Sequence, residues 1–311
     1  MIKEILNKLN RKEDLSNQEM QDVVNHIMCG EVEDNDIESF LLALNEKGIK
    51  EPEITAAATV MREKSLKFDI GDGTHIDTCG TGGTGLHTFN CSTASSFVAA
   101  AGGASITKHG NKAISSKSGS ADFLIEAGAD ISHDRNKLLN VFNQVGFIFL
   151  FAPLHHESMK YVMPARQRIG KKTIFNLLGP HTNPCGARRQ IIGVYDNSLL
   201  STFSRVAKNL DMEHVMVVHG EDGLDEISIT GPIDILKEHA DVRENNLDSS
   251  AISKLKDWLA NQRTGMQNEI KRQDASFIRR LSPTYDALYK SAQAGDNTAR
   301  AQLEFLYSRY V

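Results

Sequence analysis

The sequence has few cysteines and no long apolar run. The four cysteines (Cys29, Cys79, Cys91 and Cys185) form no C-x-x-C pair, which argues against a structural zinc site. We expect them to be small buried thiols in a reducing compartment. No apolar run approaches the ~18 residues that a membrane span needs. The amino terminus lacks the apolar core of a secretory signal peptide, so we expect a cytoplasmic protein without a membrane partner.

Positive charge is not in excess either. The chain has 35 Lys+Arg against 40 Asp+Glu, a formal net charge of −5. This balance argues against a general nucleic-acid partner but leaves a small anionic ligand open. Hydrophobic residues make up 40% of the chain and charged residues 24%, as in globular proteins, and 311 residues correspond to roughly one to two domains.

The first 70 residues predict a small helical domain. Ser16 and Glu19 form a capping-box signal ahead of apolar residues at helical spacing, and a similar signal at Asn35 predicts the start of a second helix. Gly48 is expected to end that helix, and Pro52 to lie in the first turn of a third.

From about residue 75 short apolar runs alternate with helical stretches. Strands are predicted over Ile106–Thr107, Phe147–Phe151, Ile191–Tyr195 and Val215–Val218, and helices over Ala94–Ala101, Ser120–Ala127 and Leu199–Leu210. This alternation predicts an α/β architecture with parallel strands. From Ala251 to Val311 the chain becomes basic, with ten Lys+Arg against six Asp+Glu, and we expect ordinary amphipathic helices there.

One central stretch lacks acidic residues entirely. Thr78–Ala121 contains no Asp or Glu, although the whole chain has 40. It carries the segments GTGGTG (80–85), NCST (90–93), KHGN (108–111) and SSKSGS (115–120). Two of these are Gly- or Ser-rich turns between a predicted strand and a predicted helix, an arrangement that directs backbone N–H groups at an anion. The stretch therefore predicts a phosphate site.

The glycine pattern at 80–85 is weak evidence for a dinucleotide. No acidic residue follows at the expected distance of ~20 positions, and no Gly-Lys-Ser/Thr completes a Walker A motif. A second signal is the apolar strand that ends in the turn HGEDGLDE (219–226), where Asp225 and Glu226 offer hard oxygen ligands. Mg²⁺ typically takes one or two carboxylates together with substrate phosphates, so the pair of signals favours a metal-bridged phosphate.

These segments resemble the anthranilate phosphoribosyltransferase family, in order and almost continuously from about residue 1 to 235. Further matching segments are FLFAP (149–153), TIFNLLGP (173–180) and NP (183–184). The resemblance implies a small N-terminal helical domain over residues 1–70, completed by a helical segment near 155–190. It also implies a larger α/β domain over 71–311, of nucleoside phosphorylase and phosphoribosyltransferase type, with an atypical tail at 240–311. A homodimer is the usual assembly.

The same resemblance implies transfer of a phosphoribosyl group from phosphoribosyl pyrophosphate (PRPP) to the amine of anthranilate, in tryptophan biosynthesis. By motif, PRPP would be held by Gly80, Gly82, Gly83, Thr84, Thr88, Asn90, Cys91, Ser92, Thr93, Lys108, Ser116 and Ser120. Anthranilate would be held by Gly80, Asn111 and Arg166, and Mg²⁺ by Ser92, Asp225 and Glu226. The catalytic residue stays open: His109 is a candidate base, but a loop histidine beside phosphates is as often a hydrogen-bond donor.

The chain departs from the family pattern at three places. Thr84 stands where the glycine loop usually continues with aspartate, Lys112 replaces the usual arginine, and the usual ending is not recognisable after about residue 240. Two alternatives therefore stay open. A nucleoside phosphorylase has a related fold with a Lys- and Ser-rich anion loop. A non-catalytic relative would bind a phosphoribosyl ligand or, through the basic tail, nucleic acid. Asp225, Glu226 and Arg166 favour PRPP chemistry.

Overall fold

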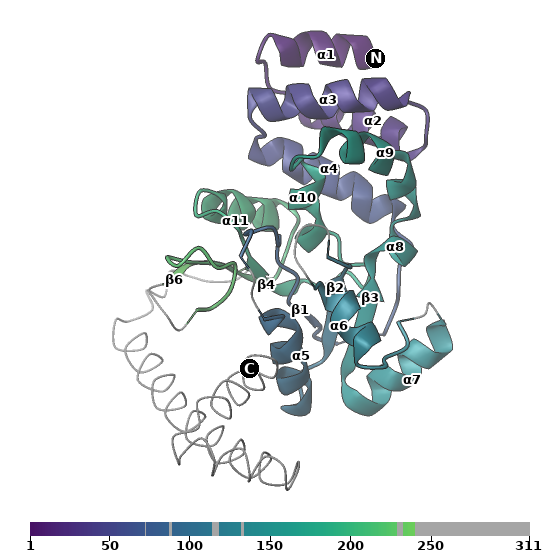
Figure 1. Ribbon diagram of the computed structural model, residues 1–311, viewed down its shortest axis with the longest axis vertical. Coiled ribbons are helices and arrows are strands. Elements are labelled where there is room, and N and C mark those ends of the chain that lie inside the picture. The colour runs from purple at the N-terminus through teal and green to yellow at the C-terminus, as the bar shows by residue number, and fades with distance from the viewer. Residues whose placement is uncertain (72, 87–88, 114–117, 132–133, 229–232, 240–311) are drawn as a thin grey trace, which may run out of the picture. The chain divides into compact units, whose positions relative to one another are not determined.

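The computed structural model describes residues 1–239 except 72, 87–88, 114–117, 132–133 and 229–232 (Figure 1). The expected helices of the tail at 240–311 therefore lie outside the described residues, as do the candidate PRPP ligands Thr88 and Ser116. Within the described part, helices near the amino terminus stand beside a six-stranded sheet that carries helices of its own. The predicted α/β class with an N-terminal helical domain is confirmed.

The helical domain begins with four helices, α1 (Ile2–Asn10), α2 (Asn17–Met28), α3 (Asp34–Lys47) and α4 (Glu51–Lys64). Helix α1 packs on α3, and α2 packs on α4. A later segment adds α8 (Ala152–His155), a 3₁₀ turn over Glu157–Tyr161, α9 (Met163–Ile169) and α10 (Phe175–Leu178). Helix α9 packs on α3 and α10 on α4, so residues from two separate parts of the chain share one apolar core.

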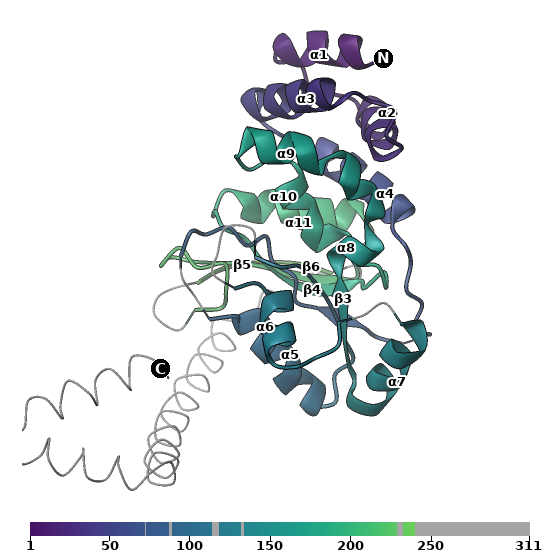
Figure 2. The same ribbon diagram turned by 45° about the vertical axis from the view of Figure 1, so that its right-hand side comes forward.

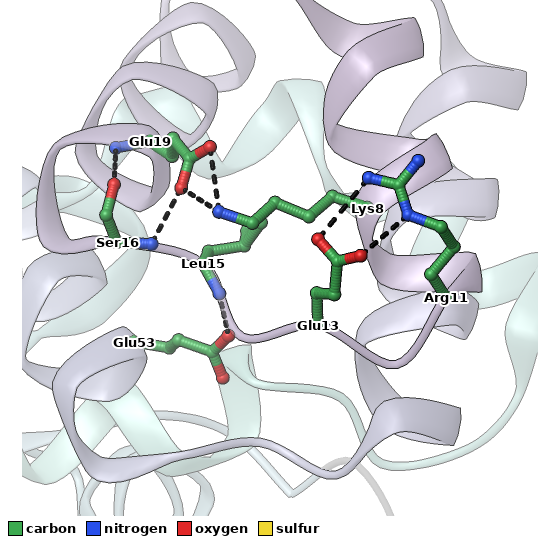
Figure 3. Close-up of polar contacts among 7 residues, drawn as sticks. All are labelled: Lys8, Arg11, Glu13, Leu15, Ser16, Glu19 and Glu53. Atoms are coloured by element: carbon green, nitrogen blue, oxygen red, sulfur yellow. Dashed lines mark hydrogen bonds and ion pairs between the residues drawn. The ribbon is translucent and has the colours of Figure 1, made fainter.

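Capping fixes where α2 begins. The Ser16 hydroxyl accepts a hydrogen bond from the Glu19 backbone N–H, and the Glu19 carboxylate accepts one from the Ser16 backbone N–H (Figure 3). Lys8 on α1 donates to the same carboxylate, at 2.8 Å from Nζ to Oε2. The hydrogen bonds that the Glu19 carboxylate accepts from Lys8 and Ser16 lower the pKa of Glu19 to about 2. The predicted capping box is confirmed.

Helix α3 starts earlier than its sequence signal indicated. Its N-cap is Glu33, so Asn35 lies inside the first turn and the predicted start is wrong. The cap makes no side-chain hydrogen bond, but Asp34 and Asp36 place negative charge at the positive end of the helix dipole. Gly48 ends the helix with φ 92°, as predicted, because glycine tolerates a left-handed φ.

The sheet has the strand order β3-β2-β1-β4-β5-β6. Its strands are β1 (Ile76–Asp77), β2 (Ile106–Gly110), β3 (Phe147–Phe151), β4 (Arg189–Gly193), β5 (His214–Gly220) and β6 (Ile233–His239). Strands β1 to β5 pair in parallel, as expected, whereas β6 runs antiparallel to β5. The strand predicted over Ile191–Tyr195 lies two residues earlier, because its first two residues pair with β5 at His214 and Val215.

Helices cover both faces of this sheet. Figure 2 shows α5 (Cys91–Ala101) and α7 (Arg135–Val145) on one face, and α11 (Leu199–Asn209) on the other face, toward the helical domain. Helix α6 (Ser120–Glu126) follows the loop after β2. The order of strands reverses between β1 and β4, and ligands of such sheets bind at the carboxyl ends of the strands beside that reversal.

The cysteines are free and less buried than expected. Cys29 is exposed, so the prediction of a buried thiol is wrong there, because the residue caps the solvent-facing end of α2. Cys79, Cys91 and Cys185 are partly buried. Among the described residues no helix is both long enough and apolar enough to cross a membrane.

Candidate active site

Four loops leave the carboxyl ends of the parallel strands at the same edge of the sheet. The glycine loop (residues 80–85) follows β1, and the loop toward α6 follows β2. The segment around Tyr195 follows β4, and the acidic turn (residues 221–226) follows β5. The glycine loop contains the predicted PRPP ligands Gly80, Gly82, Gly83 and Thr84, and the acidic turn contains the predicted metal ligands Asp225 and Glu226.

A buried carboxylate connects the strands beneath these loops. Asp77, fully buried at the end of β1, accepts hydrogen bonds through Oδ1 from the backbone N–H groups of Thr78 (2.7 Å) and His109 (3.1 Å). Its Oδ2 accepts from the side-chain amides of Asn183 (2.8 Å) and Gln190 (3.1 Å). Burial raises the pKa of Asp77, but four N–H donors require an ionised acceptor, so we assign the carboxylate form.

The motifs after β1 and β2 meet at one lysine. Lys108 on β2 is buried, and its Nζ donates to Thr78 O (3.1 Å), Thr78 Oγ1 (3.0 Å) and Ser92 Oγ (3.3 Å). The ammonium therefore holds the start of the glycine loop against the first turn of α5. Its positive charge also acts on the buried carboxylate of Asp77 and on Glu226, and it opposes the rise in the pKa of both.

The two carboxylates of the acidic turn point back at the same loops. The Ser92 backbone N–H donates to Glu226 Oε1 (3.3 Å), and the Gly82 backbone N–H donates to the Asp225 carboxylate. Burial and the neighbouring Asp225 charge raise the pKa of Glu226 to about 7, and burial also raises that of Asp225. Two adjacent, half-buried carboxylates of this kind offer hard oxygen ligands, and the arrangement fits a divalent ion.

Glycines allow the loops to approach this closely. A β-carbon on Gly193, the last residue of β4, would overlap the carbonyl oxygen of Asp225. A β-carbon on Gly80 would lie 2.9 Å from Gly193 O. The Thr81 backbone N–H donates to the same oxygen at 2.8 Å. The Thr81 hydroxyl accepts from Tyr195 N at 3.1 Å, so the glycine loop is fixed to the end of β4.

The other predicted PRPP ligands that the structure describes lie on the glycine loop or at the first turns of α5 and α6. Asn90 precedes α5, and its Nδ2 donates to Ser118 Oγ (3.2 Å), which joins the loops after β1 and β2. Ser120 opens α6, and its hydroxyl donates to Asn111 O at 3.4 Å. Thr84 accepts from Leu86 N at 3.2 Å within its own loop. Other candidates occupy the glycine loop and the first turn of α5: Gly82, Gly83, Cys91 and Thr93.

Arg166 lies in the helical layer, on α9, apart from this cluster. Its Nη2 donates to Asn176 Oδ1 (3.4 Å), and its guanidinium lies 5.9 Å from the ring centre of Phe175. Among the described residues no carboxylate pairs with it, and burial lowers its pKa. Arg168, on the same helix, is exposed and pairs with Glu38 at 2.7 Å. Arg166 is therefore a partly buried cation that has no carboxylate partner in the part of the chain that the structure describes.

His109 is a neutral imidazole at neutral pH. Burial and the neighbouring His156, 5.2 Å away between ring centres, lower the pKa of His109 to about 3. Its Nδ1 lies 3.2 Å from Gly179 O, which fixes a donor there, and its buried Nε2 has no partner among the described residues. A conjugate acid this strong makes a poor general base, so the geometry supports a hydrogen-bonding role.

Asp77, Cys79 and His109 form a second cluster of metal-ligand atoms, all within 4.8 Å of one another. The residues present do not fit a metal. Both oxygens of Asp77 are occupied by N–H donors, and burial raises the pKa of the Cys79 thiol to about 12. A protonated thiol and a saturated carboxylate are poor ligands.

The sequence did not identify two residues that shape this edge of the sheet. Asp77 has a local signal, an acid at the end of a strand directly before the glycine loop. Gly193 has none, because its close approach to Asp225 joins segments that are far apart in the sequence.

Known proteins match the chain over both parts. The glycosyl transferase family matches through its helical bundle domain at residues 3–65 and through its a/b domain at residues 72–270. The anthranilate phosphoribosyltransferase of Hydrogenovibrio crunogenus is 45% identical over 264 residues, which cover 82% of this chain and 78% of the relative. That of Methylobacillus flagellatus is 48% identical over 236 residues, which cover 75% and 69%.

Solved structures agree with these relatives. The anthranilate phosphoribosyltransferase of Thermus thermophilus has a TM-score of 0.70 at 37% identity, over 75% of this chain and 70% of that one. The Saccharomyces cerevisiae enzyme in complex with PRPP and Mg also has a TM-score of 0.70, at 28% identity, over 76% of this chain and 72% of that one. The fold predicted from the resemblance is confirmed.

Proposed function

The chain belongs to the anthranilate phosphoribosyltransferase family, and we propose that it transfers the phosphoribosyl group of PRPP to the amine of anthranilate. The products are N-(5-phosphoribosyl)anthranilate and pyrophosphate. One observation carries the proposal: Ser92 joins Lys108 to Glu226, so that the glycine loop, α5 and the acidic turn converge at one strand edge. Basic groups, loop glycines and carboxylates then surround a single place, which suits a metal-bound diphosphate.

We propose Mg²⁺ as the metal. Asp225, Glu226 and the hydroxyl of Ser92 would hold it, since their oxygens are the hard ligands that Mg²⁺ prefers. The raised pKa of both carboxylates supports this assignment, because a bound cation would offset the repulsion between them. Bound Mg²⁺ would neutralise charge that grows on the departing pyrophosphate. A solved relative from Saccharomyces cerevisiae is described in complex with PRPP and Mg.

The donor would lie along the predicted PRPP residues. The glycine loop places backbone without side chains at Gly82 and Gly83, with φ of 60° and 78°, which leaves room for the phosphates. Lys108, held by Thr78, supplies positive charge under the loop. As the bond from ribose C1 to pyrophosphate breaks, these groups would stabilise the negative leaving group.

The acceptor would lie against Arg166. A guanidinium that is partly buried and lacks a carboxylate partner among the described residues fits the carboxylate of anthranilate, with which it can form charge-assisted hydrogen bonds. Asn111 and Gly80 would complete the pocket, as the family resemblance implies. With the amine positioned below ribose C1, orientation would supply much of the rate, so a strong base is not required. This agrees with the low pKa of His109.

Three broader properties follow from family membership and are proposals here. The protein would act in tryptophan biosynthesis, in the cytoplasm, as a homodimer. Size-exclusion chromatography with light scattering tests the assembly: a mass near twice 34.3 kDa supports the dimer, and a mass near 34.3 kDa contradicts it.

The loss of anthranilate fluorescence in the presence of PRPP and Mg²⁺ tests the reaction. Loss that requires both additions supports the proposal, and no turnover at saturating substrates rejects it. Phosphate-dependent cleavage of a nucleoside without Mg²⁺ would instead indicate a nucleoside phosphorylase. Tight binding of PRPP or RNA without consumption of an amine would indicate a non-catalytic relative, and RNA binding would weaken steeply with salt.

A further inference from the structure

Lys172 brings a second ammonium group to the glycine loop. The residue lies between α9 and α10, far from the loop in sequence. A β-carbon on Gly83 would lie 3.2 Å from Lys172 Cε and 3.5 Å from its Nζ, so the end of this side chain rests beside the Gly83 backbone. The absence of a side chain at Gly83 is what allows this approach.

The ammonium of Lys172 contacts an aromatic ring. Its Nζ lies 3.2 Å from the ring centre of Tyr195, which follows β4, in a cation–π contact. Asp196 and Asp225 are close enough to act on its charge, but no carboxylate among the described residues pairs with it. Thr84, on the same loop, offers a hydroxyl that already accepts from Leu86 N.

The backbone at this position is fixed from two sides. Lys172 O accepts a hydrogen bond from Asn45 Nδ2 on α3 at 2.7 Å. The next residue, Thr173, donates its N–H to Asn176 Oδ1 at 2.9 Å, and Arg166 donates to that same oxygen. The segment that carries Arg166, the candidate anthranilate ligand, therefore also brings Lys172 to the glycine loop.

We propose that Lys172 is a substrate-positioning residue that binds the pyrophosphate group of PRPP. The inference rests on the proposed function. Lys172 ends beside Gly83 of the glycine loop, where the charges of Asp196 and Asp225 act on it. The proposed metal-binding carboxylates Asp225 and Glu226 belong with the pyrophosphate, the most anionic part of PRPP. An ammonium that stacks on an aromatic ring exchanges a weak contact for charge-assisted hydrogen bonds when a phosphate arrives. Because the backbone of Lys172 is anchored, this contact joins the segment that carries Arg166 to the bound PRPP.

Calorimetry on the full chain with Mg²⁺ tests this role with three probes: PRPP, pyrophosphate and ribose 5-phosphate. In Lys172→Met we expect affinity for PRPP and for pyrophosphate to fall ~10-fold, the order of one lost charge-assisted contact, while affinity for ribose 5-phosphate stays unchanged. Lys172→Arg should recover most of the loss. The matched control is Lys171→Met, an exposed neighbour, which should bind all three probes like the wild type.

Each remaining outcome is decisive. Wild-type binding of PRPP by Lys172→Met rejects the role of Lys172 and leaves the proposed function standing. An equal loss for all three probes, together with a lower melting temperature, assigns Lys172 a purely structural role and also rejects it. If the wild-type protein itself fails to bind PRPP, the proposed function fails first.

Discussion

Arg166 and Arg168 lie two positions apart on α9 and differ in what neutralises them. Arg168 is exposed and pairs with Glu38 and Asp34 of the helical domain. Arg166 is turned inward, with a neutral amide and an aromatic ring as neighbours. This contrast between single residues supports the proposal that Arg166 binds the carboxylate of anthranilate, whereas Arg168 forms a structural ion pair.

Arg166→Gln should raise the KM for anthranilate by about 10- to 100-fold, because it removes a charge-assisted contact of roughly 1.5–3 kcal/mol. The KM for PRPP should stay unchanged. Initial-rate kinetics with each substrate varied in turn measure both constants. Arg168→Gln is the matched control and should leave both constants near wild type. Equal effects of the two substitutions would contradict the assignment.

Gly193 acts through its lack of a side chain. A β-carbon there would overlap the carbonyl oxygen of Asp225, so Gly193→Ala should displace the acidic turn from the glycine loop. A misplacement of about 1 Å at such a site costs on the order of 100-fold in kcat/KM. Steady-state kinetics measure this loss, and circular dichroism should report an unchanged fold. Gly102→Ala is the control, because a β-carbon on Gly102 would lie 3.3 Å from its nearest neighbour, the carbonyl oxygen of Ala99, and would not overlap it. Full activity of Gly193→Ala would refute the close-approach explanation.

Site residues could be predicted where a short stretch of sequence contains the whole signal. Asp225 and Glu226 follow an apolar run, and the glycine loop lies in a stretch without acids, so both were identified from the sequence. Asp77, Gly193 and Lys172 were not identified, since each acts through a partner on another strand or loop. The sequence alone cannot show that Asn183 and Asp77 are neighbours, because 106 positions separate them.

One buried carboxylate on α4 joins that helix to α3 through an ion pair and to the loop between α1 and α2 through a hydrogen bond. Glu53 on α4 is fully buried and accepts from Leu15 N at 3.1 Å and from Lys50 N at 2.8 Å (Figure 3 shows the bond to Leu15). Lys47 Nζ lies 2.9 Å from the same carboxylate, and its side chain is only 1% exposed. One carboxylate therefore serves three donors from three elements.

Glu53→Ala should destabilise the protein by about 3 kcal/mol, since it leaves two backbone N–H groups without their acceptor and removes one of the three acceptors of the Lys47 ammonium, which keeps Asp14 and Gly48 O. Urea denaturation followed by circular dichroism measures the free energy of unfolding. Glu46→Ala breaks an exposed pair with Lys12 and should leave stability unchanged within error. A Glu53→Ala protein as stable as Glu46→Ala would show that the buried network contributes nothing.

Elements with strong local signals were predicted well. The capping box at Ser16 and the turn at Gly48 fixed two helix ends correctly. Strand β1 has only two residues, and the antiparallel β6 contains Asp234, Lys237 and Glu238, so neither shows an apolar run long enough to be recognised. Pairing in the sheet, rather than local preference, forms these strands.

At the scale of the whole molecule, three buried histidines make stability depend on pH. Burial lowers the pKa of His109 to about 3, that of His156 to about 4 and that of His181 to about 3. An unfolded chain takes up protons on these rings below pH ~6.5, whereas the folded protein does not until pH falls much further. Their contribution to stability is therefore complete above pH ~6.5 and is lost as pH falls from there toward 3–4.

Between pH 7.5 and pH 5.5 the free energy of unfolding should fall by about 1 kcal/mol for each of these histidines. Urea denaturation at a series of pH values measures the slope. His181→Leu should make this fall smaller by about 1 kcal/mol, because both ring nitrogens of His181 are buried without a partner among the described residues. An unchanged slope in this variant would contradict the neutral buried state of His181.

The architecture followed from the sequence because strands and helices alternate, which favours a parallel sheet with its ligand loops at one edge. The sharing of one core by α3 and α9 did not follow from any local pattern, since these helices are separated by more than a hundred residues and meet only through packing. The family resemblance supplied that part of the expectation.

Phosphorus NMR during turnover tests phosphoribosyl transfer to anthranilate directly, because it resolves PRPP, pyrophosphate and the phosphoribosyl product in one sample. With Mg²⁺ and anthranilate present, we expect PRPP signals to disappear while pyrophosphate and one new phosphomonoester appear in equal amounts. Their rate should follow the loss of anthranilate. Unchanged PRPP signals, or release of pyrophosphate without consumption of anthranilate, would contradict this transfer.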